Sequence, residues 1–375
     1  MVKETALYIH IPFCPKKCLY CDFPSYSGKA ALMDEYIKAL GMEIKHCVQG
    51  KIKTIFIGGG TPTFLSCSQL KMLGGFISKL DLIENAEFTV EGNPGTFTQE
   101  KLTILKEIGV NRLSIGLQAW QNELLKKLGR IHTIKQFLKS YEMALKAGFN
   151  NINIDIMFGL PGQTLENMNE TLENVISLNP SHISCYSLII EKGTPFYSLY
   201  SKGSSMLPGE ELEREMYLMC IQKLKAANYD QYEISNFAKD KKQCIHNLVY
   251  WNTEEYFGVG CAAHSFVDGV RYCNTKNVEQ YIKKISRNDF SYEDVHKNSL
   301  QDNMEEFIFM GLRKINGILI IDFNRRFGLD IFSVYGKIID KYLKLNHLIV
   351  DNGRLFLSAR GVEISNSIMC DFILT

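Results

Sequence analysis

The sequence predicts an α/β protein: a partial (β/α)6 barrel of the TIM type, followed by a smaller C-terminal α+β domain. From residue 5 to about residue 190, short apolar runs alternate with longer amphipathic runs, which is typical of repeated β-α units with a parallel sheet. The polar residues Glu91, Gln118 and Asp155 stand at or near the ends of three different predicted strands. An open sheet would spread these ends along an edge, whereas a barrel brings them to one mouth. The polar strand ends therefore favour the barrel.

Each element of the barrel follows from its local pattern. The predicted strands, all short apolar runs, are residues 6–13, 54–60, 86–94, 112–118, 151–162 and 182–190. The helices predicted between them, all amphipathic, are residues 34–47, 68–80, 99–109, 135–148 and 165–178. Six β-α units are fewer than the usual eight of the closed form, so we expect a lateral opening for a large substrate.

Beyond the barrel the pattern changes. Residues 193–211 carry the turn formers of a connecting loop, and residues 210–229 predict an amphipathic helix. Residues 232–271 are rich in aromatics, glycine and histidine, with no β-α pattern. Further on, helical segments precede LIVDNGRLFLS, where Asn352-Gly353 between two apolar runs is a strong hairpin signal.

These changes predict three regions. They are the barrel at residues 1–205, a connecting extension at residues 206–290 and a small C-terminal domain at residues 291–375. Helices followed by a hairpin make the last region winged-helix-like. A lid or packing role is favoured over DNA binding, because no strongly basic helix accompanies the hairpin.

Composition narrows the function classes. The formal net charge is only +1 over 375 residues, so nothing in the charge favours a nucleic-acid partner or an acidic membrane. The sequence contains neither a signal peptide nor about 20 consecutive apolar residues, so we expect a cytoplasmic location, with any membrane contact peripheral. Eleven cysteines, an odd number, argue against a disulfide framework, and those that stand singly are expected to pack in the core.

Three cysteines form the exception. In HIPFCPKKCLYCDF, the residues Cys14, Cys18 and Cys21 follow the pattern C-x3-C-x2-C. Structural zinc usually needs four ligands, and the chain has no second C-x2-C pair; Cys244 or His246 could complete a zinc site, but the spacing does not indicate it. Three thiolates on a tight loop suit three corners of a cubane [4Fe–4S] cluster. The fourth iron would then be open to a small molecule.

This motif, directly after a first strand and with an aromatic at Tyr20, resembles the signature of the radical S-adenosylmethionine (SAM) superfamily. The resemblance implies that the open iron chelates SAM and that an electron from the cluster cleaves its sulfonium bond, which gives a 5′-deoxyadenosyl radical. Further positions match the porphyrin-linked branch of that superfamily by order and local context. The resemblance implies that the SAM site is formed by Tyr8, Gly59, Gly60, Thr61, Glu91, Gln118, Arg130 and Asp155. Taken singly, each could equally make a structural hydrogen bond or salt bridge.

Two groups of that branch compete: oxygen-independent coproporphyrinogen III oxidases and heme chaperones of the HemW type. The oxidases carry a further cysteine two positions after the third cluster cysteine, where this chain has Phe23. They also carry a long N-terminal extension, whereas thirteen residues precede Cys14 here. The segment HNLVYW fits the H-N-x-x-Y-W motif of the chaperones. Its candidate heme residues are His246, Asn247, Tyr250 and Trp251.

The resemblance therefore implies a chaperone that binds a [4Fe–4S] cluster, SAM and heme, and delivers heme to acceptors such as a respiratory protein at the membrane. The axial heme ligand stays open, because Cys244, His264 and Tyr250 compete with His246. The alternative is an oxidase that decarboxylates two propionates of coproporphyrinogen III to give protoporphyrinogen IX. A third possibility is another radical SAM reaction on a different substrate. The sequence predicts no oligomeric state.

Overall fold

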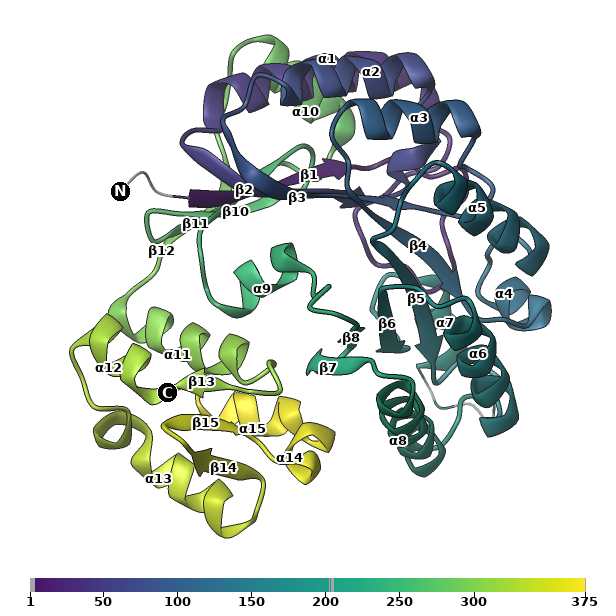
Figure 1. The fold of residues 1–375 in the computed structure, drawn as a ribbon. Coiled ribbons are helices and arrows are strands. Elements are labelled where there is room, and N and C mark those ends of the chain that lie inside the picture. Colours follow the sequence, from purple (N-terminus) through teal and green to yellow (C-terminus); the bar gives the residue numbers. More distant parts are fainter. Residues whose placement is uncertain (1–3, 202, 204–205, 375) are drawn as a thin grey trace.

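The computed structural model describes residues 4–201, 203 and 206–374 (Figure 1). Within this part of the chain, six parallel strands lie side by side in chain order. They are β1 (Glu4–Ile11), β2 (Lys51–Gly59), β3 (Leu82–Gly92), β4 (Arg112–Gln118), β5 (Ile152–Phe158) and β6 (His182–Ser187). Each strand pairs with the next one along the chain, as in a barrel, so the predicted partial (β/α)6 barrel is confirmed.

Helices cover the convex side of this curved sheet (Figure 1). The predicted helices between strands are α1 (Met33–Cys47), α2 (Cys67–Ile77), α3 (Gln99–Glu107), α5 (Ile134–Lys146) and α6 (Leu165–Ser177). Two short 3-10 turns, Ala30–Leu32 and Pro62–Phe64, precede α1 and α2, and α4 (Asn122–Lys127) precedes α5. Thr133 and Thr164 start α5 and α6 with capping boxes, which satisfy the first free amides of each helix.

Both edges of the barrel carry additional strands that the sequence pattern did not reveal. On one side, β9 (Tyr256–Val259) pairs parallel with β1 and continues into β10 (His264–Val267), β11 (Val270–Cys273) and β12 (Glu293–Lys297), which pair antiparallel. On the other side, β8 (Asn236–Ala238) pairs antiparallel with β6, and β7 (Asp230–Glu233) follows it.

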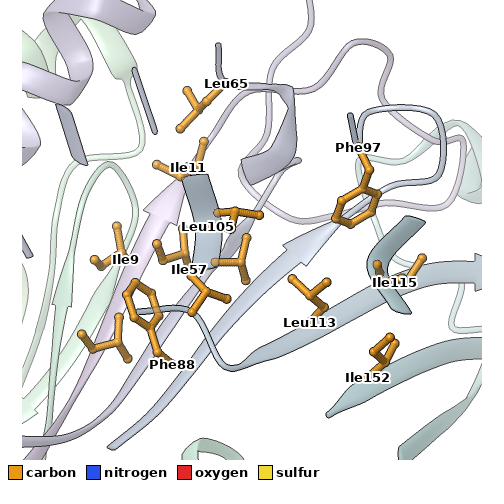
Figure 2. Close-up of a cluster of buried hydrophobic side chains, with 14 of the residues drawn as sticks. Ile9, Ile11, Ile57, Leu65, Phe88, Phe97, Leu105, Leu113, Ile115 and Ile152 are labelled. Atoms are coloured by element: carbon orange, nitrogen blue, oxygen red, sulfur yellow. The ribbon is translucent and has the colours of Figure 1, made fainter. Parts of the chain in front are cut away.

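The two faces of the barrel sheet differ in polarity because side chains alternate along a strand. One face packs its apolar side chains under the helices; Figure 2 shows Ile9, Ile57, Phe88, Leu113 and Ile152 in this core. The other face carries mostly polar side chains. On β3 to β6 they are Glu87, Thr89, Glu91, Arg112, Ser114, Asn153, Asp155, His182 and Ser184. The chemistry of the barrel therefore lies on its inner side.

The region after the barrel is more ordered than the turn formers predicted. Helix α7 (Pro195–Tyr200) occupies part of the predicted loop, with Thr194 capping it and Pro195 at its first position. Residues 202 and 204–205 of that predicted loop lie outside the described residues. Helix α8 (Glu210–Ala226) agrees with the predicted amphipathic helix. The further helices of this region are α9 (Ile245–Trp251) and α10 (Val278–Ser286).

The C-terminal elements form their own hydrophobic cluster around Phe323, Tyr335 and Leu355. They are α11 (Leu300–Gly311), β13 (Ile318–Leu319), α12 (Ile320–Phe327), α13 (Ile331–Lys344), β14 (Leu348–Asp351), β15 (Arg354–Leu357), α14 (Ala359–Glu363) and α15 (Ser365–Asp371). The predicted hairpin is present: Asn352 (φ 49°) and Gly353 (φ 72°) form the turn between β14 and β15, with the two left-handed residues of a type I′ turn.

Helix α9, which carries HNLVYW, lies on the inner side of the barrel sheet, between the sheet and the C-terminal elements (Figure 1). The region boundaries near residues 205 and 290 stay predictions. Among residues 4–201, 203 and 206–374, no helix has both the length and the apolar character needed to cross a bilayer.

Candidate functional site

The three clustered cysteines line one cavity of about 490 Å³ at the ends of the barrel strands, called here the cysteine cavity. Their loop is held by backbone hydrogen bonds: Cys14 N donates to Tyr26 O (3.0 Å), and Leu19 N donates to Leu128 O (3.0 Å). Two side chains contact the sulfurs directly. Thr61 Oγ1 donates to Cys14 Sγ, and Arg130 Nη1 donates to Cys18 Sγ, both at 3.5 Å.

The donor set, three cysteine thiols at one cavity, fits a cubane cluster. Burial raises the pKa of the Cys14 and Cys21 thiols, and the charge of Cys18 raises both further, so each of these two sulfurs lies within electrostatic range of Cys18. Yet in the described residues no three His, Cys, Asp or Glu side chains gather closely enough to hold one metal ion. A cubane accepts each thiolate on a different iron. Neither Cys244 nor His246 lines the cysteine cavity, so neither completes a zinc site there.

The glycine turn at the end of β2 approaches the end of β1 closely. Gly59 has φ +107°, and a Cβ there would lie 2.4 Å from the His10 ring; a Cβ on Gly60 would lie 2.7 Å from Phe13 O. Gly60 N donates to Ile11 O at 2.8 Å. Only glycine fits this packing, and both glycines line the cysteine cavity.

Two half-buried carboxyl groups, those of Glu91 and Asp155, face the same cavity. Burial, with a contribution from Asp155, raises the pKa of Glu91 to about 8, and Gly59 N donates to Glu91 Oε2 (3.2 Å). Burial also raises the pKa of Asp155, which accepts from Asn153 Nδ2 (2.7 Å) and Ser114 Oγ (3.2 Å). Two carboxylates in one low-dielectric cavity repel each other, so a cationic ligand would stabilise both. The sulfonium of SAM meets this requirement.

Arg130 is one of three cationic side chains that line the cavity, with Lys16 and Lys17. It follows α4, and its Nη2 donates to Asn93 Oδ1 (2.6 Å) and Gly116 O (2.5 Å). Its Nε is buried with no hydrogen-bond partner among the described residues. A buried donor without a partner is costly, so this atom fits an anionic group of a ligand, such as the carboxylate of SAM. Gln118, with φ +73° at the end of β4, lines the same cavity.

Two of the predicted SAM residues lie elsewhere. Thr61 does not line the cysteine cavity; it holds Cys14 and accepts a hydrogen bond from Asn93 Nδ2 (2.8 Å). Tyr8 faces a neighbouring cavity, where its hydroxyl bonds His10 Nδ1 (2.9 Å). The assignment of all eight residues to SAM stays a prediction.

The sequence interpretation also missed supporting residues. Asn93 joins Arg130 to Thr61 and lies two residues after Glu91, within the VEGNPGT stretch itself. Ser114 and Asn153 position Asp155. The signal that could have identified them is the alternation of polar and apolar side chains along β4 and β5, which places these polar residues on the inner face.

The candidate heme residues divide between two sides of α9. The residues His246, Asn247 and Tyr250 line a small cavity of about 220 Å³, called here the histidine cavity. It adjoins the cysteine cavity, because Phe23, Gly59 and Glu91 line both. Trp251 lies on the other side of the helix, with the Arg313 guanidinium over its ring at 4.7 Å.

Helix α9 is fixed to the inner face of the sheet. Glu87 accepts hydrogen bonds from Ile245 N (3.0 Å) and His246 N (2.9 Å), and a carboxylate stabilises this end of a helix. The His246 ring is buried, with Nδ1 on Thr54 Oγ1 and Nε2 on Tyr250 OH, both at 2.8 Å. Burial lowers the pKa of His246 to about 3, so the ring is neutral at pH 7. Both nitrogens of this potential ligand are therefore occupied.

The competing heme ligands lie in different surroundings. Cys244 is fully buried beside Glu87, and burial raises its pKa to about 12. His264 is exposed on β10 and lines neither the cysteine nor the histidine cavity. The axial ligand stays unassigned.

Two family models and several heme chaperones match this chain. Residues 8–175 match the family model of the Radical SAM superfamily, and residues 298–364 match that of the HemN C-terminal domain. The chain is 41% identical over 372 residues to the heme chaperone HemW of Bacillus subtilis (strain 168), with 98% of each chain covered. It is 42% identical over 273 residues to the heme chaperone HemW of Escherichia coli (strain K12), with 70% of this chain and 71% of that one covered.

A solved structure resembles the whole chain. The coproporphyrinogen III oxidase HemN from Escherichia coli, described as a radical SAM enzyme, has a TM-score of 0.86 and covers 98% of this chain and 90% of its own. The sequence identity is 23%, so this similarity shows the fold and not the activity.

Proposed function

The chain belongs to the HemW family of heme chaperones, and we propose that it binds heme as cargo and delivers it to acceptor proteins. The observation that carries this proposal is the position of α9, the HNLVYW helix. It lines the histidine cavity, which adjoins the cysteine cavity, and Phe23, Gly59 and Glu91 line both cavities. Cargo held on the histidine side of α9 would therefore lie beside the residues proposed for the radical SAM cofactors.

Membership of the radical SAM superfamily implies a [4Fe–4S] cluster and SAM. We propose that Cys14, Cys18 and Cys21 hold the cluster, and that Arg130 and Glu91 bind the charged groups of SAM. The remaining SAM residues are proposed to be Tyr8, Gly59, Gly60, Thr61, Gln118 and Asp155. When bound, the cluster and SAM would supply reductive cleavage of the sulfonium bond. Arg130 and Asp155 would orient SAM. Asn93 holds Arg130 in place by a hydrogen bond, and Ser114 and Asn153 do the same for Asp155.

For heme we propose His246, Asn247, Tyr250 and Trp251 as binding residues. A neutral imidazole is the form that binds iron, and burial keeps His246 neutral. Its Nε2 would have to leave Tyr250 OH first. We further propose that the acceptors are respiratory heme proteins at the membrane, reached from the cytoplasm through peripheral contact.

The alternative function is oxidation of coproporphyrinogen III, and both functions can be tested on one anaerobically reconstituted preparation. Heme is titrated and the absorption spectrum recorded; SAM, reductant and coproporphyrinogen III are then supplied and the tetrapyrrole products measured. We expect one heme bound per chain and no protoporphyrinogen. The absence of a stoichiometric heme complex would exclude the chaperone proposal, and formation of protoporphyrinogen would favour the oxidase.

A further inference from the structure

The largest cavity of those described lies on the far side of α9 from His246. Its volume is about 750 Å³, and it is called here the basic cavity. Leu248 and Trp251 of α9 form one wall, and the stretch 314–319 with α12 and Arg354 forms the other. Sites for small molecules commonly measure about 300 to 1,000 Å³. The basic cavity falls within that range, whereas the histidine cavity, at about 220 Å³, is smaller.

The lining of the basic cavity carries unbalanced positive charge. Four cationic and two acidic side chains line it. Both acidic groups already have cationic partners, since Asp322 pairs with Arg325 and Glu254 pairs with Lys53. The other three cations, Lys314, Arg326 and Arg354, form no ion pair with a carboxylate of the described residues.

These three cations donate only to neutral oxygens. Lys314 Nζ bonds Asn252 Oδ1 (2.5 Å), Arg326 Nη1 bonds Thr253 Oγ1 (2.7 Å) and Arg354 Nη1 bonds Asn316 O (3.2 Å). Burial lowers the pKa of Lys314 and the charge of Arg354 lowers it further, while the charges of Glu254 and Asp322 act in the opposite direction. Like charges held together in a partly buried space are destabilising until an anion joins them, so the cavity favours an anionic ligand.

The rest of the lining favours a ligand with a large flat apolar body. Trp251, Leu248 and Phe307 present aromatic and aliphatic surface to the cavity. The indole Nε1 of Trp251 is buried and has no hydrogen-bond partner among the described residues. A small inorganic anion would leave this wall uncovered. An aromatic macrocycle with carboxylates at one edge would cover the wall and reach the cations together.

We propose that the basic cavity captures heme through its propionate carboxylates, which bind Lys314 and Arg354, while the macrocycle packs against Trp251. This inference rests on the proposed heme chaperone function and names the groups that recognise the cargo. The HNLVYW helix then separates two cavities. Trp251 contacts the captured macrocycle in the basic cavity, and His246 lies on the opposite side of the helix, where both of its ring nitrogens form hydrogen bonds. Capture through carboxylates on this side of α9 therefore needs neither the iron nor His246, and coordination of the iron by His246 on the other side would be a separate step.

The test is a titration of the full chain, anaerobically reconstituted, with hemin and with hemin dimethyl ester, whose carboxylates are blocked. Hemin should bind the double variant Lys314→Gln/Arg354→Gln at least about tenfold more weakly than wild type, because charge-assisted hydrogen bonds are lost. The matched control is Arg360→Gln, which removes an exposed cation of α14 outside the cavity and should bind hemin as wild type does. The ester should bind wild type as weakly as hemin binds the double variant.

The outcomes distinguish failure of the carboxylate site from failure of the proposed chaperone function. If wild type binds hemin and the double variant binds it equally well, the carboxylate site is wrong while the chaperone function stands. If wild type binds no hemin, both fail. Should the double variant not fold, the wild-type comparison decides alone: equal affinity for hemin and its ester overturns the proposal.

Discussion

The cysteine cavity and the basic cavity hold their polar groups in opposite ways. In the cysteine cavity, polar side chains bind one another: Arg130 bonds Asn93, Asn93 bonds Thr61, and Thr61 bonds Cys14. In the basic cavity, Lys314 and Arg354 donate only to neutral oxygens and lack a carboxylate partner in the described chain. We infer that the first arrangement suits a cofactor that stays bound and that the second suits a ligand that is taken up and released. The predictions below test this difference.

The largest effect is expected at the cluster ligands. Replacing Cys14, Cys18 or Cys21 by alanine should remove nearly all bound iron and sulfide, because among the described residues these three are the cysteines that line the cavity proposed for the cubane. Iron and sulfide analysis after anaerobic reconstitution measures this. Cys370→Ala, which changes an exposed cysteine outside the cavity, should retain the full content. A cysteine variant of the loop that keeps its cluster would contradict the ligand assignment.

The next effect concerns Arg130, the cation of the cysteine cavity that donates to Cys18. Arg130→Lys keeps the charge but loses the planar fork that reaches Cys18, Asn93 and Gly116. SAM affinity should fall roughly tenfold to a hundredfold, as expected for lost charge-assisted hydrogen bonds. Calorimetric titration on protein of equal iron content is the measurement. Arg287→Lys, an exposed change after α10, serves as the control; equal SAM affinity in both variants would remove Arg130 from the SAM site.

A smaller effect is expected on the histidine side of α9. Coordination of iron by His246 requires Nε2 to leave Tyr250 OH. Tyr250→Phe removes this competing hydrogen bond, and hemin affinity should rise about twofold to tenfold. Adding His246→Ala should cancel the gain, which a hemin titration of the single and double variants can measure. A gain that persists without His246 would assign the iron to another ligand.

The smallest effect is the pH dependence of stability without iron and SAM. Burial raises the pKa of Glu91 to about 8 in the folded chain, so the folded state binds this proton more tightly than the unfolded state. The stability is therefore complete at low pH and is lost as the pH rises toward 8. Between pH 5 and 8, the melting temperature of wild type should fall by roughly 2–5 °C more than that of Glu91→Gln.

The control for this pH effect is Glu84→Gln, which changes an exposed carboxyl on the same strand and should follow wild type. Parallel pH profiles for wild type and Glu91→Gln would show that Glu91 is not held protonated in the cavity.

The barrel was predictable because its signals are local and periodic. The bounds of β4, residues 112–118, agree in the sequence and the structure. The polar ends of parallel strands met at one cavity, as barrel geometry requires. The sequence placed Asp155 at or near the end of its strand, but the residue lies in the middle of β5, although it does line the cysteine cavity. Helix α7 was hidden among turn formers, although Thr194-Pro195 is a typical helix start.

The second region was not predictable for a physical reason. Strands as short as β8, with three residues, show no usable alternation, and Cys244, which precedes α9, makes no side-chain capping hydrogen bond. The residues of the basic cavity come from segments between Gln231 and Arg354 and meet only through tertiary packing. Hydrogen bonds such as those of His246 to Thr54 and Tyr250 are also invisible in the sequence.

The central claim is that heme and the iron–sulfur cluster occupy separate sites in one chain. The direct test is a hemin titration of the triple variant Cys14→Ala/Cys18→Ala/Cys21→Ala beside wild type, with bound iron–sulfur cluster measured in both. We expect the triple variant to hold no cluster, yet to bind one hemin per chain with an affinity similar to that of wild type. Loss of hemin binding together with the cluster, in a chain that still melts cooperatively, would contradict the account.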